Sequence, residues 1–234
     1  MKITAMTYNI CSGMNMARQR DLKFASSVIN QVKPDFVTLN EVSSFIWGVP
    51  HNQALEMGRL TGYYPVFGKA VEINGGDYGN GFLSHHPVVE QEVIPIPDRK
   101  SDEKTYFETR AVLRCVVDIG GKLITVLSTH FGLARVEAQS AVETVLKILE
   151  TEKNPVLLQG DLNLRPHDEI LKPIFAAMHD TAEGKEEIMT FSSEKPDRKI
   201  DYIFHSDGIR TLKLYSVDTL CSDHLPLIAE LEID

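Results

Sequence analysis

Six polar clusters, spread along the whole chain, contain the residue types that hydrolysis of a phosphate ester requires. They are Asn9, Glu41, His130, Asp161 with Asn163, Asp201, and Asp223 with His224. Carboxylate and amide oxygens bind hard divalent cations. A histidine can activate water, and a carboxylate can orient that histidine. These residue types therefore predict metal-assisted hydrolysis, provided that folding brings the clusters together.

Four of these side chains stand just past apolar segments of strand length. Asn9 and Glu41 follow residues 2–8 and 36–39, with a helix-like pattern at 21–32 between them. His130 and Asp161 follow residues 122–128 and 156–158, with a helix-like pattern at 135–150 between them. A single polar residue after a strand is commonly a turn residue. Four at matching strand ends instead favour one shared site, because such ends meet at the rim where ligands bind.

The strongest short motif is Gly-Asp-Leu-Asn at residues 160–163. The glycine allows a ligand to approach the backbone closely. Asp161 and Asn163 are separated by one residue, so an extended backbone would point both side chains the same way. Together they could hold a water molecule and a phosphate oxygen. The alternative is an Asx turn that opens the next helix.

Asp201 lies inside the apolar segment Ile-Asp-Tyr-Ile-Phe at 200–204. A carboxylate in such surroundings is costly unless a partner compensates its charge. We take His224 as the candidate partner. The alternative is an aspartate that faces solvent from an edge strand.

The remaining periodic segments complete two similar halves. A helix is predicted at 51–60, and a shorter helical piece from Asp168 is limited by Pro173. Further strands are predicted at 64–71, 79–84, 88–95 and 109–118 in the first half, and at 200–204, 209–216 and 226–233 in the second. Two mixed sheets packed face to face, with helices outside, would bury both halves. Residues 72–78, 98–106 and 183–196 are predicted loops. No linker is recognisable, so residues 1–234 are predicted to form a single domain.

Composition narrows the functional classes. Of 234 residues, 43% are hydrophobic and 24% are charged, which is typical of a globular protein. The net charge of −9 argues against non-specific binding of duplex DNA. Neither a signal peptide nor a transmembrane segment is recognisable, so we expect a cytoplasmic protein without stable membrane insertion. The three cysteines form neither a zinc motif nor a disulfide framework.

Seven ordered motifs and one arginine resemble the endonuclease/exonuclease/phosphatase superfamily. They are TYNI (7–10), LNEV (39–42), GNGFLS (79–84), Arg110, STHF (128–131), GDLN (160–163), IDYIF (200–204) and SDHLP (222–226). The resemblance extends from Thr7 to Pro226. It implies a four-layered α/β sandwich (DNase I-like) with the site at one end. It also implies a hydrolase that acts on phosphoester bonds with a divalent cation.

Carried onto this chain, the resemblance implies a Mg²⁺ or Mn²⁺ site at Glu41, with Asn9 beside it and Asp223 contributing. A hard cation with carboxylate, amide and water ligands suits magnesium better than zinc. Arg110 and Asn80 would bind the substrate phosphate.

The resemblance also implies catalytic roles. Asp161 and Asn163 would orient the attacking water and the scissile phosphate, and His130 would donate to a phosphoryl oxygen. His224, oriented by Asp201, would activate water. Members of the superfamily are described with either this histidine or the Asp161 equivalent as the base, and both remain open here.

Departures from the family pattern bear on the substrate. Asn40 replaces the glutamine that often precedes the metal-binding glutamate, and Ser43 and Ser44 stand where related abasic-site endonucleases place a lysine. Together with the acidic charge, short loops after His130 and Asn163 favour a small or single-stranded phosphate substrate. The classes considered are a nucleotide, a nucleic-acid end, a sugar or inositol phosphate, and a lipid head group. The alternatives are a DNA endonuclease or exonuclease, and a catalytically silent binding module, which the intact polar set disfavours.

Overall fold

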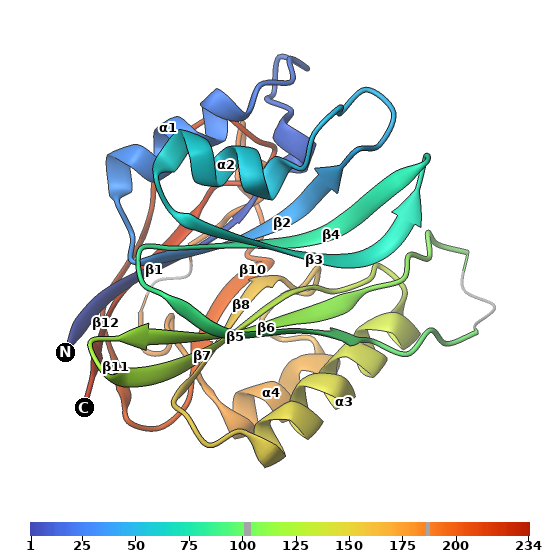
Figure 1. Ribbon diagram of the computed structural model, residues 1–234. Coiled ribbons are helices and arrows are strands. Elements are labelled where there is room, and N and C mark those ends of the chain that lie inside the picture. The colour runs from blue at the N-terminus through green and yellow to red at the C-terminus, as the bar shows by residue number, and fades with distance from the viewer. Residues whose placement is uncertain (101–103, 186–187) are drawn as a thin grey trace.

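Two six-stranded sheets pack face to face between two layers of helices, which confirms the predicted four-layered α/β sandwich (Figure 1). The computed structural model describes residues 1–100, 104–185 and 188–234. Parts of two predicted loops, 101–103 and 186–187, therefore lie outside the described residues. The first sheet has the order β11-β12-β1-β2-β4-β3, and the second has the order β5-β6-β7-β8-β10-β9.

The strands of the first sheet are β1 (Lys2–Asn9), β2 (Phe36–Ser44), β3 (Tyr64–Ile73), β4 (Gly76–Ser84), β11 (Ile209–Ser216) and β12 (Leu227–Ile233). Those of the second sheet are β5 (Val88–Pro95), β6 (Ala111–Ile119), β7 (Lys122–His130), β8 (Val156–Asp161), β9 (His179–Asp180) and β10 (Asp201–His205). The helices are α1 (Leu22–Val32), α2 (Gln53–Thr61), α3 (Arg135–Thr151) and α4 (Lys172–Ala177), with short 3₁₀ turns at Cys11–Gly13 and Glu169–Leu171.

The two halves of the sequence exchange strands, which corrects the simple division into halves. Strands β5 and β6 belong to the second sheet, and β11 and β12 belong to the first. Strand β12 pairs antiparallel with β1, from Lys2 opposite Glu232 to Thr7 opposite Leu227. This pairing covers an edge of β1 that would otherwise expose unpaired backbone groups. Sequence periodicity does not reveal which strand edge another strand will cover.

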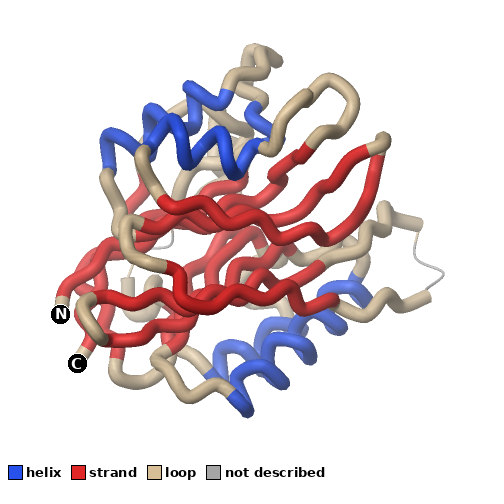
Figure 2. The backbone as a smooth tube through the Cα atoms, in the orientation of Figure 1, coloured by secondary structure: helices blue, strands red, loops and turns tan. Residues whose placement is uncertain are grey.

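Helices cover the outer face of each sheet (Figure 2). Helix α1 begins where the Asp21 side chain accepts a hydrogen bond from the Lys23 amide, and it ends at Lys33 in a left-handed conformation. Helices α1 and α2 pack on the first sheet, and α3 and α4 pack on the second. Pro173 lies in the first turn of α4 and does not end a helix as predicted. A proline fits there because the first amides of a helix need no intrahelical partner.

The predicted loop at 72–78 is largely a β-hairpin. Strands β3 and β4 are joined by Asn74 and Gly75, both with positive φ. Such a pair matches the two-residue turns that suit the twist of antiparallel strands. No helix among the described residues is long and apolar enough to cross a membrane.

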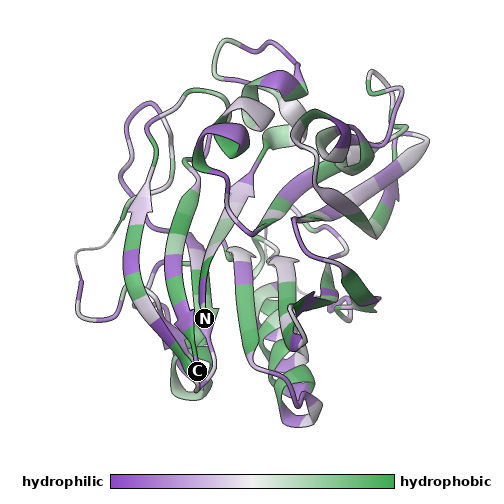
Figure 3. Cartoon of the chain, turned by 60° about the vertical axis from the view of Figure 1, so that its left-hand side comes forward, coloured by the Kyte–Doolittle hydropathy of each residue, from purple (hydrophilic) through white to green (hydrophobic). Residues whose placement is uncertain are grey.

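The space between the sheets changes from apolar to polar along the strands. Side chains alternate between the two faces of each strand, and inner-face residues near one end form an apolar core that includes Ala5, Phe36 and Leu157. The next inner positions are polar and buried, and the Thr38 and Ser128 hydroxyls are hydrogen-bonded across the sheets at 2.7 Å. Figure 3 shows hydrophobic and hydrophilic residues alternating along many of the strands. The polar end is where the candidate site lies.

The first prediction concerns Gly160, which has a φ of 149°. A Cβ added at this position would lie 1.8 Å from the carbonyl oxygen of Thr129 on β7. Gly160→Ala should therefore lower the free energy of unfolding by about 3 kcal/mol or more. Gly120→Ala is the control, since Gly120 also has positive φ but has open space around it. The control should lose about 1–2 kcal/mol. Urea unfolding of both variants measures the difference, and equal losses would contradict the steric explanation.

Candidate active site

The register of the parallel strands brings four sequence-predicted residues to one rim. Asn9 ends β1 opposite Asn40 on β2. His130 ends β7 opposite Asp161, which ends β8. Asp201 at the start of β10 is also opposite Asp161, in an antiparallel pair. The common rim expected from the strand-helix-strand pattern is therefore present in both sheets.

Glu41 reaches this rim through an irregularity in β2. Asn40 occupies the inner-face position, so strict alternation would turn Glu41 toward the outer face. The pairing of β2 with β4 shifts register between Leu39 and Val42, and Glu41 has a left-handed backbone with φ 57°. β-Bulges of this kind redirect side chains next to active sites. The sequence offers no local signal for this bulge.

Asn9 joins carboxylates from the two sheets. Its amide nitrogen donates to Glu41 Oε1 at 3.0 Å and to Asp161 Oδ2 at 3.1 Å. Its amide oxygen accepts a hydrogen bond from the Cys11 amide at 3.0 Å. Two carboxylates thus converge on one weakly positive group, and this position is electrostatically suited to a cation.

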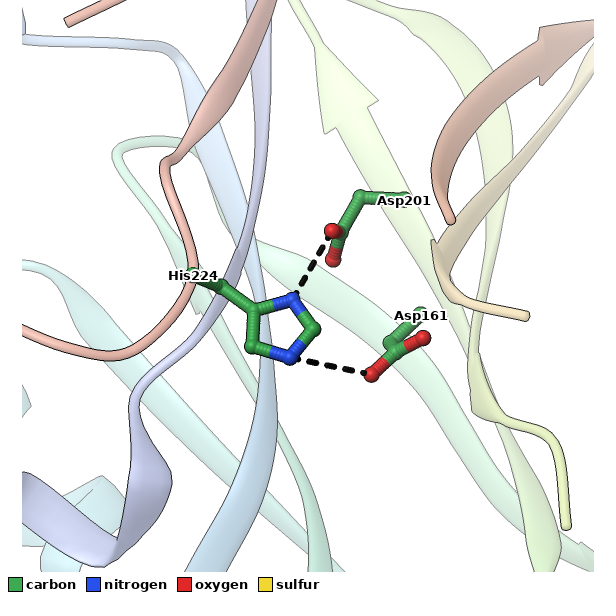
Figure 4. Close-up of side chains that lie close together, drawn as sticks. All are labelled: Asp161, Asp201 and His224. Atoms are coloured by element: carbon green, nitrogen blue, oxygen red, sulfur yellow. Dashed lines mark hydrogen bonds and ion pairs between the residues drawn. The ribbon is translucent and has the colours of Figure 1, made fainter. Parts of the chain in front are cut away.

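His224 lies between two aspartates (Figure 4). Its Nδ1 is 2.9 Å from Asp201 Oδ2, which confirms the predicted contact, and its Nε2 is 3.5 Å from Asp161 Oδ2. Burial disfavours the charged ring, but attraction to Asp201 and Asp161 outweighs it and raises the pKa of His224 to about 10. Burial raises the pKa of Asp161 to about 7, even though His224 acts in the opposite direction.

Contacts of His130 determine which of its ring nitrogens carries the proton. Arg110 Nη1 lies 2.9 Å from His130 Nδ1, and a guanidinium can only donate. Burial, together with the positive charge of Arg110, lowers the pKa of His130 well below its usual value, so the ring is neutral. A charged donor bonds more strongly than a neutral one, so we take Nδ1 as the acceptor and place the proton on Nε2, which is 3.5 Å from Asp161 Oδ2. Glu108 pairs with the same guanidinium at 2.7 Å and holds it in place.

Asn163 lies near His130, but not through the extended geometry that its spacing suggested. Strand β8 ends at Asp161, and Asn163 has a left-handed backbone with φ 53°. Its amide donates to Asp161 Oδ1 at 2.9 Å, so the Asx-turn alternative describes the backbone correctly. Its side-chain nitrogen donates to the Phe131 carbonyl and lies 3.0 Å from His130 Nε2. A neutral ring has one acceptor nitrogen, so the donors of Asn163 and Arg110 favour opposite tautomers of His130.

Asn80 does not present a free polar atom to a substrate phosphate, which corrects its predicted role. It is buried, its oxygen accepts from Asn40 at 2.8 Å, and its nitrogen donates to the Ala111 carbonyl at 3.0 Å. Asn40 in turn accepts from the Asp161 amide at 2.9 Å. The two asparagines therefore support Asp161 from behind. Sequence reasoning identified Asn40 only as a departure from the family pattern.

The C-terminal cluster is anchored to β1. The Ser222 hydroxyl donates to the Asn9 carbonyl at 2.7 Å, and the Asp223 carbonyl accepts from the Ser193 amide at 2.7 Å. These bonds place Asp223 beside Cys11. Burial and the negative charge of Asp223 raise the pKa of the Cys11 thiol to about 12. This thiol is therefore protonated and poorly suited to act as a nucleophile.

Glu41, Asn9 and Asp223 are oxygen-bearing groups on one side of the site that could hold a divalent cation. Burial raises the pKa of Glu41, and the nearby charge of Asp223 adds to this effect, although the Asn9 hydrogen bond opposes it. The positive charges of His224 and Arg110 act on Glu41 in the opposite direction and lower its pKa. Among the described residues, the group of three or more acidic, histidine or cysteine side chains with ligand atoms within 4.8 Å of one another is Asp161, Asp201 and His224, which does not include Glu41 or Asp223. There, however, His224 Nδ1 is already engaged by Asp201.

Comparisons with known proteins agree with the motifs and the fold. The model of the Endonuclease/Exonuclease/phosphatase family matches residues 6–224. An endonuclease/exonuclease/phosphatase from Beutenbergia cavernae is 22% identical, with TM-score 0.79, covering 99% of this chain and 72% of that one. One from Bacteroides vulgatus is 19% identical, with TM-score 0.81 and 100% of both chains covered. A mannosyl-6-phosphatase from Bacteroides thetaiotaomicron is 16% identical, with TM-score 0.77, covering 99% of this chain and 100% of that one. No curated protein sequence matches the chain.

The contact between Arg110 and His130 generates a second prediction. In the wild type, ¹⁵N NMR of the ring nitrogens should show a neutral His130 with the proton on Nε2 at pH 6.5. Arg110→Met removes a positive charge that lowers the pKa of His130, so this pKa should rise and both tautomers should be populated. Arg114→Met, on β6, which begins directly after Arg110, removes an arginine paired with Glu90 and Glu152; it is the control and should leave His130 unchanged. A wild-type proton on Nδ1 would rule out the assignment.

Proposed function

Because the chain belongs to the endonuclease/exonuclease/phosphatase family, we propose that it is a divalent-metal-dependent hydrolase of phosphoester bonds. One observation carries the proposal. Carboxylates from the two sheets, Glu41 and Asp161, converge on the Asn9 amide, and Asp161 also faces His224. The metal-binding side of the site and the side that handles the proton thus meet at the buried carboxylate of Asp161.

Glu41, with Asn9 and Asp223, would hold Mg²⁺ or Mn²⁺. The cation, when bound, would polarise the phosphoryl oxygen and stabilise the charge that develops during attack. The Asn9 amide would have to turn its oxygen toward the cation. Such a rotation exchanges two groups of similar size. In return, the cation would replace the amide nitrogen as the positive partner of Glu41.

Asp161 and His224 would handle the proton of the attacking water. Asp161 Oδ2 lies next to both the Asn9 amide and His224 Nε2, so it is placed to orient water and accept its proton. Asp201 would keep Nδ1 of His224 engaged, so that Nε2 faces the reaction. The spatial arrangement favours Asp161 as the first proton acceptor, with the protonated His224 beside it to stabilise the charge of that carboxylate.

The other side of the site would bind the phosphate. His130 would donate its Nε2 proton to a non-bridging oxygen, because Arg110 keeps that proton off Nδ1. The Asn163 amide group next to it could donate to a second oxygen of the same phosphate. Arg110 itself is buried between Glu108 and His130. Its main effect would therefore be to position His130 and add positive charge.

We further propose a small or single-stranded substrate. The net charge of −9 opposes the approach of a long polyanion. The mannosyl-6-phosphatase with the same fold supports including sugar phosphates among the candidates, along with nucleotides, nucleic-acid ends, inositol phosphates and lipid head groups. At 16% identity, this likeness does not select one of them.

Removal of metal generates the third prediction. Hydrolysis of bis-p-nitrophenyl phosphate, short RNA and sugar phosphates should require Mg²⁺ or Mn²⁺ and cease with excess EDTA, because the two clustered carboxylates would then repel the phosphate. Readdition of metal should restore activity, which controls for irreversible unfolding. Duplex plasmid should be the poorest substrate in the panel. Equal rates with and without EDTA would exclude the metal mechanism, and preferred cleavage of plasmid would support the nuclease alternative.

The Asp201–His224 pair generates the fourth prediction. His224→Ala should reduce kcat by roughly 10²-fold or more, because a group that handles the proton is lost. Asp201→Asn should cause a smaller loss, because the ring remains but its orientation and charge balance change. His205→Ala, at the opposite end of β10, serves as a folding control and should retain most activity. A folded His224→Ala variant with wild-type turnover would remove His224 from the mechanism.

A further inference from the structure

We propose that Gln53, the first residue of α2, positions Glu41 for metal binding, an inference that rests on the proposed metal role of Glu41. Gln53 is almost fully buried and is 1% exposed. Its side chain joins the segment that follows Asn9 to the segment that follows Glu41. It belongs to none of the motifs that resemble the family, and it contacts neither the candidate metal site nor the phosphate side directly.

The need for such a residue arises where β1 ends before β2. The parallel pairing of the two strands stops at Asn9 and Asn40, and the last backbone bond runs from the Ile10 amide to the Asn40 carbonyl at 3.1 Å. Strand β2 continues to Ser44. On that side, beyond residue 40, the strand has no paired strand and only an isolated bridge from Ser44 to Asn52. Buried backbone groups without partners are strongly unfavourable.

Side chains replace the missing strand. Gln53 Oε1 accepts from the Ser43 amide at 2.9 Å, and Gln53 Nε2 donates to the Ser12 carbonyl at 2.7 Å. The Ser12 hydroxyl lies 2.8 Å from the Ser43 hydroxyl and donates to the Glu41 carbonyl at 3.3 Å. Together, Gln53 and Ser12 fix the backbone from the Glu41 carbonyl to Ser43, directly after the left-handed Glu41.

The start of α2 is itself fixed to the end of β2. Asn52, which caps the helix, accepts from the Leu55 amide and donates to the Ser44 hydroxyl at 3.1 Å. Gln53 is therefore not a flexible surface group. The helix holds it at a set position, and it transmits that position to Ser43, two residues after Glu41.

The consequence concerns the Glu41 backbone. A left-handed conformation is unfavourable for glutamate and persists only when surrounding contacts impose it. Without Gln53, the bulge can relax toward regular strand geometry, which would turn the carboxylate away from Asn9. The cation would then lose its principal ligand. Asp161 and His130, on the second sheet, are held by contacts that do not involve Gln53, so their positions should not change.

The test is direct Mn²⁺ binding to the full chain, measured by isothermal titration calorimetry. Gln53→Ala should weaken Mn²⁺ binding by about 10-fold or more, as is typical for groups that orient metal ligands. At saturating Mn²⁺, kcat should stay within about 2-fold of wild type, because Asp161, His224 and His130 are untouched. Gln53→Glu preserves the side-chain volume and the acceptor for Ser43 but loses the donor to Ser12. Its affinity for Mn²⁺ should therefore lie between those of the wild type and Gln53→Ala.

Tyr63→Phe is the matched control. It removes another buried side-chain bond next to α2, from the Tyr63 hydroxyl to the Pro34 carbonyl at 2.5 Å, without contacting β2 near Glu41. This control should lose stability but keep wild-type Mn²⁺ affinity. The proposal is wrong if folded Gln53→Ala or Gln53→Glu binds Mn²⁺ like the wild type, or if Tyr63→Phe weakens binding equally. Failure of the wild type to bind Mn²⁺ would instead overturn the proposed metal function.

Discussion

The burial of several carboxylates between two sheets is the constraint on which the site depends. Asp161 and Asp201 are almost completely inaccessible, and Glu41 is partly buried. Negative charges in such a place require compensation. Asp201 receives it from His224, Glu41 and Asp161 share the Asn9 amide, and a divalent cation would complete the balance. The buried carboxylates that require charge compensation are therefore the same groups that the proposed chemistry uses.

The architecture makes this burial tolerable by separating apolar from polar layers along the strands. One end of the inter-sheet space is filled by side chains such as Ala5, Phe36 and Leu157, which supply the hydrophobic driving force. The opposite end contains the charged groups, and hydroxyls such as those of Thr38 and Ser128 separate the two. The inner faces of the same strands thus contribute both the stability of the fold and the site.

Much of the site was predictable because its residues obey local rules. Asn9, His130 and Asp161 end apolar strands of two similar halves, and parallel pairing brings such ends together. Asp201 inside an apolar strand called for a partner, and His224 is at hydrogen-bonding distance. Departures from these rules were not predictable. Glu41 depends on a bulge supported by Gln53 and Ser12, groups that the sequence places 12 residues after it and 29 before it.

The sequence by itself determined the family, the four-layered fold and the residue types of the site, because motif order and strand periodicity are properties of the chain. Only the tertiary structure decided how those residues are used. It exchanged strand pairs between the sheets, bonded Asn80 to Asn40, and placed the Arg110 guanidinium against Nδ1 of His130. The physical reason is that hydrogen-bond partners and edge pairings depend on contacts between distant segments, which no local pattern encodes.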